Sequence, residues 1–177
     1  MAAKALKAGL IIAYPTEAVW GLGCDPYNET AVHKLLKLKE RDVAKGLLLV
    51  AASLAQIDSL LLTLEETERQ RLRQPSPVAT TWLIPDPNND YPPWIKGRHA
   101  EVAIRISAHP LVRAICTEFG GPIVSTSANL AGEPEIRSRT GLMESFGNKI
   151  DFFAEGKLGG AAAPSQIRNL RTGERIR

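Results

Sequence analysis

The sequence LIIAYPTEAVWGLGCD, residues 10–25, joins a short apolar run to a polar pair and a loop that contains two glycines. The run at 10–13 predicts a buried strand, and Pro15 ends it because proline has no N–H to donate to a central ladder. Thr16 and Glu17 follow at the end of that strand. The glycines beyond them allow the backbone to approach another group closely. Such a stretch is typical of the floor of a ligand site in an α/β protein, although an ordinary strand-to-loop turn has the same pattern.

The size and composition of the chain are those of a globular protein. Its 177 residues suit one domain spanning 1–177. Hydrophobic residues make up 44% and charged residues 23%, which are ordinary fractions. No apolar run approaches the ~20 residues that a membrane helix needs, and the run at 10–13 is shorter than the ~7–15 residues of a signal-peptide core. We therefore expect a cytoplasmic protein.

Cysteine and histidine usage argues against disulfide and metal chemistry. The two cysteines, Cys24 and Cys116, are too few for a disulfide scaffold and lack the spacing of metal ligands. We expect both to be small buried apolar side chains. The three histidines are scattered, so no metal site is predicted. A formal net charge of +3 and a pI of about 9.0 favour an anionic partner without identifying it.

Strands and helices are expected to alternate along most of the chain. Strands are predicted at 10–13, 47–52, 78–84, 101–106, 122–124 and 150–156. Helices are predicted at 4–9, 31–40, 53–73, 110–119 and 138–146. The helix at 31–40 has Asn28 as a candidate N-cap. Residues 86–91 are expected to form an exposed loop, and the chain ends in a predicted hairpin about Thr172-Gly173.

Three cations occupy the connection between the predicted helix at 31–40 and the strand at 47–52. Lys39 and Arg41 lie two residues apart, so in an extended connection both side chains would face the same way, and Lys45 follows four residues later. A solvated turn is the ordinary explanation for such a charge run. The position at the entrance to a buried strand favours a binding role instead.

Polar residues suited to anions also occur in and after two later strands. Arg105 lies on the face of its strand opposite Ile104 and Ile106, so it is either at a sheet edge or paired with an anion, and both alternatives stay open. Residues 125–129 supply hydroxyls, an amide and backbone N–H groups at a strand end. No G-x-S-x-G elbow is present, which argues against a serine nucleophile. Cations and hydroxyls without a nucleophile–base pair indicate phosphoryl or nucleotidyl transfer.

Five blocks of the sequence follow one another in order and span nearly the whole chain: YPTEAVWGLGCD, LKLKERDVAKGLLLV, VAIRISAHP, PIVSTSANLAGEP and PSQIRNLRTGE. Within them, a K-x-R and S-x-N combination is carried by Lys39, Arg41, Ser127 and Asn129. Together they resemble the YrdC-like threonylcarbamoyl-AMP synthase family. The resemblance implies an α/β fold, a single-domain open twisted mixed sheet flanked by helices and curled around a large basic cavity. The chain resembles the short bacterial form, without the extra C-terminal domain of the long form.

The resemblance also implies an activity. Members of this family are nucleotidyltransferases that make threonylcarbamoyl-AMP and pyrophosphate from L-threonine, bicarbonate or CO₂, and ATP. The product serves the N6-threonylcarbamoyladenosine modification of tRNA next to the anticodon. ATP is therefore expected as a substrate, accompanied by Mg²⁺, with no tightly bound cofactor. The expected partners are the proteins of the tRNA threonylcarbamoyl-transfer complex and, as a further candidate, tRNA or another RNA, with no membrane partner.

By the same resemblance, the candidate site residues fall into three groups. The catalytic candidates are Lys39 and Arg41. The ATP-binding candidates are Arg41, Lys45, Ser127, Asn129 and Arg177. The L-threonine-binding candidates are Thr16, Arg105, Ser125 and Ser165. Arginine suits the threonine carboxylate because its guanidinium can bind both carboxylate oxygens.

The chain departs from the family pattern at several positions. Ala18 stands where many members carry threonine or serine, and residues 74–82 read QPSPVATTW where a W-P-G-P segment is usual. Glu135 falls near a position where long-form members contact ATP with a small polar residue, so that contact is not carried over. Two alternatives to the synthase stay open: a non-catalytic module that binds tRNA or rRNA, and a carbamoyl-transfer module that acts on another acceptor.

Overall fold

The strands of the protein form two mixed sheets instead of the one sheet expected from the sequence. The computed structural model describes residues 1–130, 132–161 and 163–176. One sheet consists of β1 (Ile12–Pro15), β2 (Trp20–Gly23), β7 (Thr126–Ser127) and β8 (Phe152–Phe153). The other consists of β3 (Leu48–Ala51), β4 (Thr80–Pro85), β5 (Glu101–Ile106), β6 (Ile123–Val124) and β9 (Gln166–Asn169).

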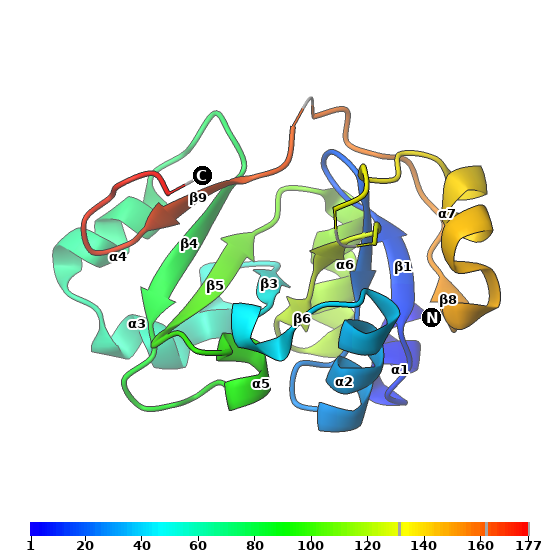
Figure 1. Ribbon diagram of the computed structural model, residues 1–177. Coiled ribbons are helices and arrows are strands. Elements are labelled where there is room, and N and C mark those ends of the chain that lie inside the picture. The colour runs from blue at the N-terminus through cyan, green and yellow to red at the C-terminus, as the bar shows by residue number, and fades with distance from the viewer. Residues whose placement is uncertain (131, 162, 177) are drawn as a thin grey trace.

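Helices cover the two sheets, which stand side by side in Figure 1. The α-helices are α1 (Ala2–Lys7), α2 (Glu29–Leu38), α3 (Asp58–Thr63), α4 (Glu66–Arg73), α5 (Pro93–Lys96), α6 (Pro110–Phe119) and α7 (Arg139–Phe146). Single 3₁₀ turns are η1 (Val43–Lys45), η2 (Leu54–Ile57) and η3 (Gly147–Lys149). Asn28 caps α2 as predicted, because its side-chain oxygen accepts a hydrogen bond from the Ala31 N–H at 3.0 Å.

Ser125 is the point at which the chain passes from one sheet to the other. The strand order is β7-β2-β1-β8 in the four-stranded sheet and β6-β3-β5-β4-β9 in the five-stranded sheet. β6 ends at Val124 in the second sheet and β7 begins at Thr126 in the first. The Ser125 N–H bonds to the Leu48 carbonyl while the Val124 N–H bonds to the Cys24 carbonyl, at 2.8 and 3.0 Å. Because the chain changes sheets at Ser125, the strands form two sheets. The alternation of apolar residues does not reveal this change, so the sequence predicts one sheet.

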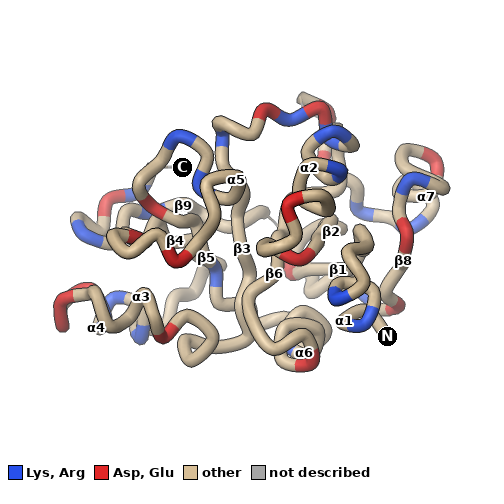
Figure 2. Tube along the Cα trace, turned by 90° about the horizontal axis from the view of Figure 1, so that it is seen from below, with Lys and Arg blue, Asp and Glu red and all other residues tan. Residues whose placement is uncertain are grey.

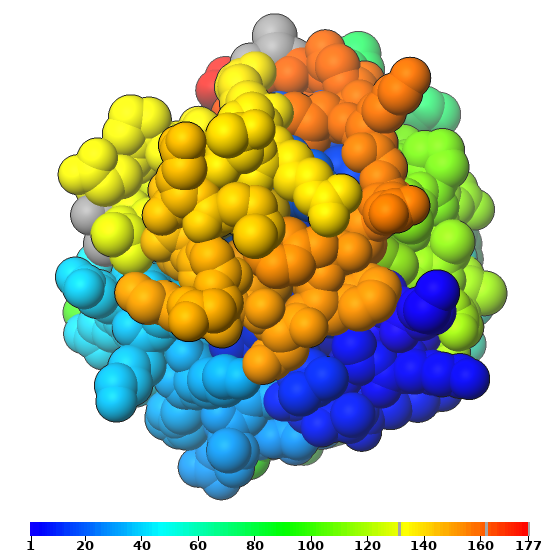
Figure 3. Space-filling view, turned by 90° about the vertical axis from the view of Figure 1, so that its right-hand side faces the viewer, coloured from blue at the N-terminus to red at the C-terminus, as the bar shows by residue number. Residues whose placement is uncertain are grey.

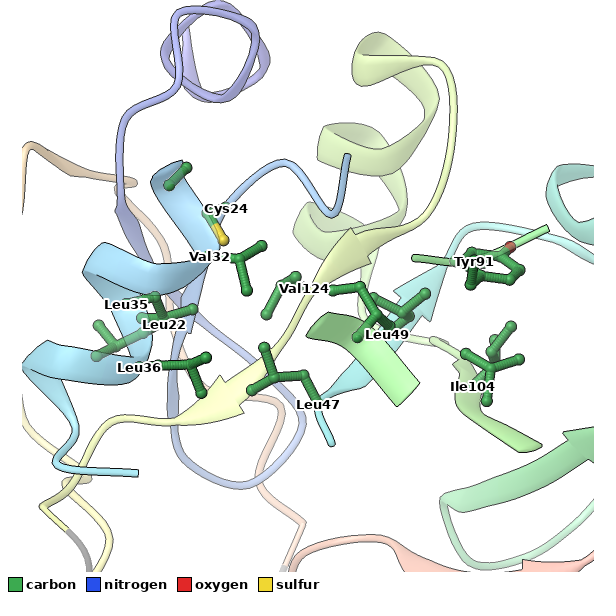
Figure 4. Close-up of a cluster of buried hydrophobic side chains, with 14 of the residues drawn as sticks. Leu22, Cys24, Val32, Leu35, Leu36, Leu47, Leu49, Tyr91, Ile104 and Val124 are labelled. Atoms are coloured by element: carbon green, nitrogen blue, oxygen red, sulfur yellow. The ribbon is translucent and has the colours of Figure 1, made fainter. Parts of the chain in front are cut away.

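Strands β1 and β3 are covered on both of their faces. This burial explains why the sequence has an unbroken apolar run at each of them. Ala13 of β1 and Leu49 of β3 lie in one buried cluster with Leu35 of α2. Figure 4 shows Val124 of β6 between the α2 side chains and Leu49 in this cluster. Ile12 and Val50 lie in a second cluster beneath α1 and α6. The prediction that Cys24 and Cys116 are buried apolar side chains is confirmed, since both are free and 0% exposed.

The prediction of one helix over 53–73 is wrong, because η2, α3 and α4 occupy this stretch. Leu64 and Glu65 have extended backbones between α3 and α4. Glu65 starts α4 with a capping box, in which the Glu65 N–H donates to Glu68 Oε2 at 2.9 Å. A capping box satisfies the free N–H groups at the start of a new helix. The helical spacing of apolar residues continues through Leu64 and Glu65, so the sequence pattern does not reveal the break.

The prediction of an exposed loop at 86–91 is wrong at both of its ends. Asp86 and Tyr91 are 4% and 3% exposed. The Asp86 carboxylate accepts the N–H groups of Asp90 and Tyr91 at 2.8 and 3.1 Å and pairs with the Lys96 ammonium at 2.9 Å. Aspartate folds a loop back on itself in this way because its short side chain reaches nearby backbone N–H groups.

Late segments of the chain pack against its beginning. The Asp151 carboxylate accepts a hydrogen bond from the Ile11 N–H at 2.8 Å and pairs with the Lys34 ammonium at 2.8 Å, and Figure 3 shows α7 and the residues after it beside α1 and α2. The predicted terminal hairpin is confirmed by an antiparallel bridge between Arg168 and Arg175. No helix in the described part of the chain has the length and apolarity to span a membrane.

Candidate active site

A pocket of about 210 Å³ is lined by residues of both sheets. Its lining from the four-stranded sheet comes from the β1–β2 turn, β2 and β7, and its lining from the other sheet comes from β3, β5 and β9. Of the residues predicted to form the site, the pocket brings together Thr16, Arg41, Arg105, Ser125, Ser127 and Ser165. Lys39, Lys45 and Asn129 are not among the described lining residues. Residues from position 16 to position 167 therefore line one pocket.

The connection after α2 turns sharply, so Lys39 and Arg41 have different environments. Glu40 has a φ of 51°, in the left-handed region, and the Arg41 N–H bonds back to the Leu36 carbonyl at 3.0 Å. The Arg41 guanidinium donates to the Gly46 carbonyl through Nε and Nη2, at 3.3 and 2.9 Å, and lines the pocket. The expectation that both cations face the same way is wrong because a left-handed residue closes the helix end.

Lys39 lies beneath the loop that follows β7. It is 5% exposed, and its ammonium donates to the Ser127 carbonyl, to the Asn129 carbonyl at 2.7 Å and to Asn129 Oδ1 at 3.4 Å. These acceptors match the three N–H groups of an ammonium. Burial, with a smaller effect from the Arg41 charge, lowers the pKa of Lys39 to about 8. The side chain thus connects the end of α2 to the 127–129 loop.

The Asn129 side chain is engaged within its own loop. Its Nδ2 donates to the carbonyls of Leu130 and Glu133 at 3.0 and 2.7 Å, and its Oδ1 accepts from Ser127 Oγ at 2.6 Å. Lys39 shares that oxygen. Lys39 and Asn129 therefore act together as an internal clip, which we call the Lys39–Asn129 clip, and the clip holds Ser127 at the pocket wall.

Arg105 lies in β5, the central strand of its sheet, which rules out the edge-strand alternative. Its Nη1 is 3.3 Å from Glu17 Oε2, and the two side chains are 10% and 14% exposed. Glu17 Oε1 accepts from Ser107 Oγ at 2.7 Å and from the Ala108 N–H at 3.2 Å. Burial raises the pKa of Glu17, but the Arg105 charge and these hydrogen bonds together hold the pKa below its ordinary value.

The hydroxyls of the pocket come from three places. Thr16 Oγ1 donates to the Val19 carbonyl at 2.8 Å and so closes the β1–β2 turn. Ser125 lies at the crossing between the sheets. Ser165, just before β9, has its Oγ 2.8 Å from Thr81 Oγ1, and Thr81 is fully buried. The sequence analysis missed Thr81, because nothing in the strand pattern VATTWLI distinguishes a threonine that supports the site from one that only packs in the sheet.

The other predicted residues are placed as follows. Lys45 ends η1 and is exposed. Arg177 lies outside the described residues. Glu135, which was set aside in the sequence, lines the pocket, as does Ala18. In the described part of the chain no cluster of His, Cys, Asp and Glu could hold a metal ion.

Comparison with known proteins identifies the family. A family model described as "Telomere recombination" (Sua5_yciO_yrdC) matches residues 4–177. This chain belongs to the Sua5–YciO–YrdC family. Its relatives in that family include the threonylcarbamoyl-AMP synthases of Chromohalobacter salexigens and Stutzerimonas stutzeri, which are 48% and 51% identical to it. Each alignment covers 99% of this chain and 94% of the relative. The resemblance stated from the five sequence blocks is therefore confirmed.

Solved structures of the Sua5–YciO–YrdC family share the fold. The crystal structure of P. abyssi Sua5 complexed with L-threonine superimposes with a TM-score of 0.87 at 28% identity and covers 96% of this chain. This chain spans 50% of that Sua5 chain. E. coli YciO has a TM-score of 0.79 at 18% identity, over 95% of this chain and 81% of YciO, which shows the common fold.

Proposed function

We propose that this protein is a threonylcarbamoyl-AMP synthase, a nucleotidyltransferase that joins L-threonine, bicarbonate or CO₂, and ATP and releases pyrophosphate. Relatives named for this activity are about half identical to the chain over nearly its full length. The observation that carries the proposal is the pocket, in which Arg41 and Arg105 stand with hydroxyls from both sheets. Cations and hydroxyls in this arrangement suit a carboxylate at one end and phosphates at the other.

The threonine end of the site is assigned to Arg105 and to the hydroxyls of Thr16, Ser125 and Ser165. Arg105 binds the substrate carboxylate, because a guanidinium offers parallel N–H groups to both carboxylate oxygens. The hydroxyls can both donate and accept, so they suit the amine and hydroxyl of threonine. A Sua5 structure with L-threonine bound supports the presence of an amino-acid site in this fold.

The ATP end of the site is assigned to Arg41 and Ser127, which line the pocket. Arg41 neutralises phosphate charge as pyrophosphate leaves. Lys45 is exposed and can extend to a triphosphate from outside the described pocket. Asn129 contributes through the Lys39–Asn129 clip. The family resemblance assigns Arg177 to ATP as well, and this residue lies outside the described ones. A basic cavity large enough for both substrates is part of this proposal.

The chemistry proceeds in two steps. The amine of threonine first adds to CO₂ and loses a proton, which gives a carbamate. A carbamate oxygen then attacks the α-phosphorus of ATP in line, the bond between the α-phosphorus and the bridging oxygen breaks, and pyrophosphate leaves. The protein contributes positioning and charge stabilisation, without a covalent enzyme intermediate.

Mg²⁺ fits this site as a companion of ATP. Magnesium is bound in proteins mainly through substrate phosphates and one or two carboxylates. Glu135 is the carboxylate of the described pocket lining and would supply the protein oxygen. Mg²⁺ bound there would neutralise triphosphate charge, and Arg41, which lines the same pocket, would contact the phosphates separately.

The product serves tRNA modification in this proposal. Threonylcarbamoyl-AMP is passed to partner proteins that transfer the threonylcarbamoyl group to the adenosine next to the anticodon. The protein acts in the cytoplasm, where ATP and tRNA are available.

Pyrophosphate release from ATP tests the proposal. The purified protein should release pyrophosphate only when L-threonine and bicarbonate are both present, and mass spectrometry should detect the adenylate. Arg41→Ala should lower turnover by roughly 100-fold or more, whereas Arg113→Ala, an exposed change on α6, should leave turnover unchanged. Release that does not need threonine would point to another acceptor, and no release from folded protein would reject the proposal.

A non-catalytic RNA-binding module is the second candidate, favoured by the net charge of +3. Figure 2 shows Lys and Arg interspersed with Asp and Glu along the chain instead of gathered on one face. Only 6% of residues are aromatic, which leaves few stacking platforms for bases. If RNA binding were the main function, RNA affinity would fall steeply with salt and would not respond to threonine.

A further inference from the structure

Glu17 carries an ion pair at the pocket that the proposed roles do not use. Its Oε2 is 3.3 Å from Arg105 Nη1, yet neither Oε2 nor the Arg105 Nε has a hydrogen-bond partner. Glu17 itself does not line the pocket, whereas Arg105 does. The carboxylate therefore contacts the guanidinium from a residue that is not part of the described pocket lining.

Glu17 is firmly anchored by the segment that follows β5. Its Oε1 accepts from Ser107 Oγ and from the Ala108 N–H, at 2.7 and 3.2 Å. Ser107 is 1% exposed, and its Oγ also accepts the His109 N–H at 3.2 Å. The backbone is held as well: the Gly159 N–H donates to the Thr16 carbonyl at 2.9 Å, and the Ala161 N–H donates to the Glu17 carbonyl at 2.8 Å. The position of Oε2 is thus fixed from two directions.

We infer that Glu17 is a positioning residue that orients the Arg105 guanidinium toward the carboxylate of the amino-acid substrate. This inference rests on the proposed function. A buried guanidinium without a counter-ion is costly, so in the empty pocket the Glu17 carboxylate compensates the Arg105 charge and holds the side chain in place. Because Glu17 engages Nη1, other N–H groups of the guanidinium stay available for a second carboxylate.

Two opposing effects decide the result of removing the Glu17 charge. Without that charge, Arg105 would attract an anion more strongly. Without the carboxylate, Arg105 would also lose its fixed orientation, and an amide at position 17 would direct N–H groups at the guanidinium. We expect orientation to dominate, because both side chains are about nine-tenths buried and bidentate recognition depends on alignment.

The test compares L-threonine with L-threoninamide, which lacks the carboxylate charge. Glu17→Gln should raise the KM for L-threonine about tenfold and leave the KM for ATP unchanged. It should also reduce the preference of the enzyme for L-threonine over L-threoninamide by a similar factor, a change that general loss of stability would not produce. Glu68→Gln is the matched control, because Glu68 is also buried and ion-paired but lies in α4; it should change neither ratio.

The outcomes separate this inference from the proposed function. Wild-type protein without threonine-dependent pyrophosphate release would reject the function. Active wild-type protein with an unchanged or lower threonine KM in Glu17→Gln would reject the positioning role. If Glu17→Gln does not fold, Ser107→Ala removes one anchor of Glu17 and keeps both charges. This variant should raise the threonine KM by a smaller factor, and an unchanged KM would again reject the role.

Discussion

The Lys39 ammonium lies 2.7 Å from the carbonyl oxygen of Asn129, although the two residues are 90 positions apart. Together with the Ser127 carbonyl and Asn129 Oδ1, this contact occupies the N–H groups of the ammonium. Lys39 is therefore in a position to shape the wall that carries Ser127. In this arrangement Arg41, which lines the pocket, is the cation of the K-x-R motif suited to contact phosphates.

Lys39→Met tests the Lys39–Asn129 clip. Loss of the ammonium should release the 127–129 loop, and we expect kcat/KM to fall by roughly 100-fold, because small misplacements of binding groups have effects of that size. Lys37→Met changes an exposed lysine in the last turn of α2, two residues before Lys39, and should have no effect on kcat/KM. Steady-state kinetics would measure both variants. Wild-type turnover in Lys39→Met would contradict the role of the clip.

The pKa of Lys39 predicts how activity and stability depend on pH. This pKa is about 8 in the folded protein, below the value of ~10.4 for an unfolded lysine. As pH rises through this window, the folded protein loses a proton that the unfolded chain keeps, so the group adds stability with rising pH. Activity should fall in the same window, because a neutral amine has two N–H groups for three acceptors.

The measurement is kcat/KM on both sides of the Lys39 pKa, for wild-type protein and Lys39→Arg. A guanidinium stays charged throughout, so the alkaline fall should disappear from whatever activity Lys39→Arg retains. The same fall in both proteins would assign it to another group.

Thr81→Val tests the support of Ser165. Valine keeps the β-branched shape and removes the hydroxyl that lies 2.8 Å from Ser165 Oγ. We expect the free energy of unfolding to drop by about 1–2 kcal/mol, the usual cost of an unpaired buried polar group, and the KM for threonine to rise several-fold. Thr80→Val, on the other face of β4, should leave the threonine KM unchanged. Equal threonine KM values in the two variants would contradict the prediction.

Asp86→Asn tests the buried ion pair in the 86–91 loop. Asp86 and Lys96 have side chains that are 0% and 8% exposed, so the change leaves an uncompensated ammonium. We expect a loss of about 3 kcal/mol in the free energy of unfolding, with threonine and ATP KM values unaffected. Urea denaturation would measure the loss, with exposed Asp58→Asn as the control. The Lys96 ammonium also donates to Asn89 Oδ1 at 2.7 Å, and similar stability of both variants would show that this contact is enough to hold the ammonium.

Much of the fold could be predicted from local sequence patterns. The Asn28 cap of α2 and the end of β1 at Pro15 are features of neighbouring residues, and both were predicted, although β1 begins at Ile12 instead of Leu10. The break at Glu65 was missed because a capping box interrupts a helix without interrupting its apolar period. The residue types of the site were also visible as cations and hydroxyls at strand ends.

What the sequence by itself determined is which segments are buried and which chemical groups stand at their ends. Only the tertiary structure decided that there are two sheets, that Lys39 faces a loop while Arg41 faces the pocket, and that Glu17 is the ion partner of Arg105. Contacts in and around the site join residues 88, 90 and 84 positions apart: Lys39 with Ser127, Glu17 with Ser107, and Thr81 with Ser165. Sequence periodicity reports only which face a residue occupies, whereas a hydrogen bond needs its partner within about 3 Å, and folding alone brings such distant partners together.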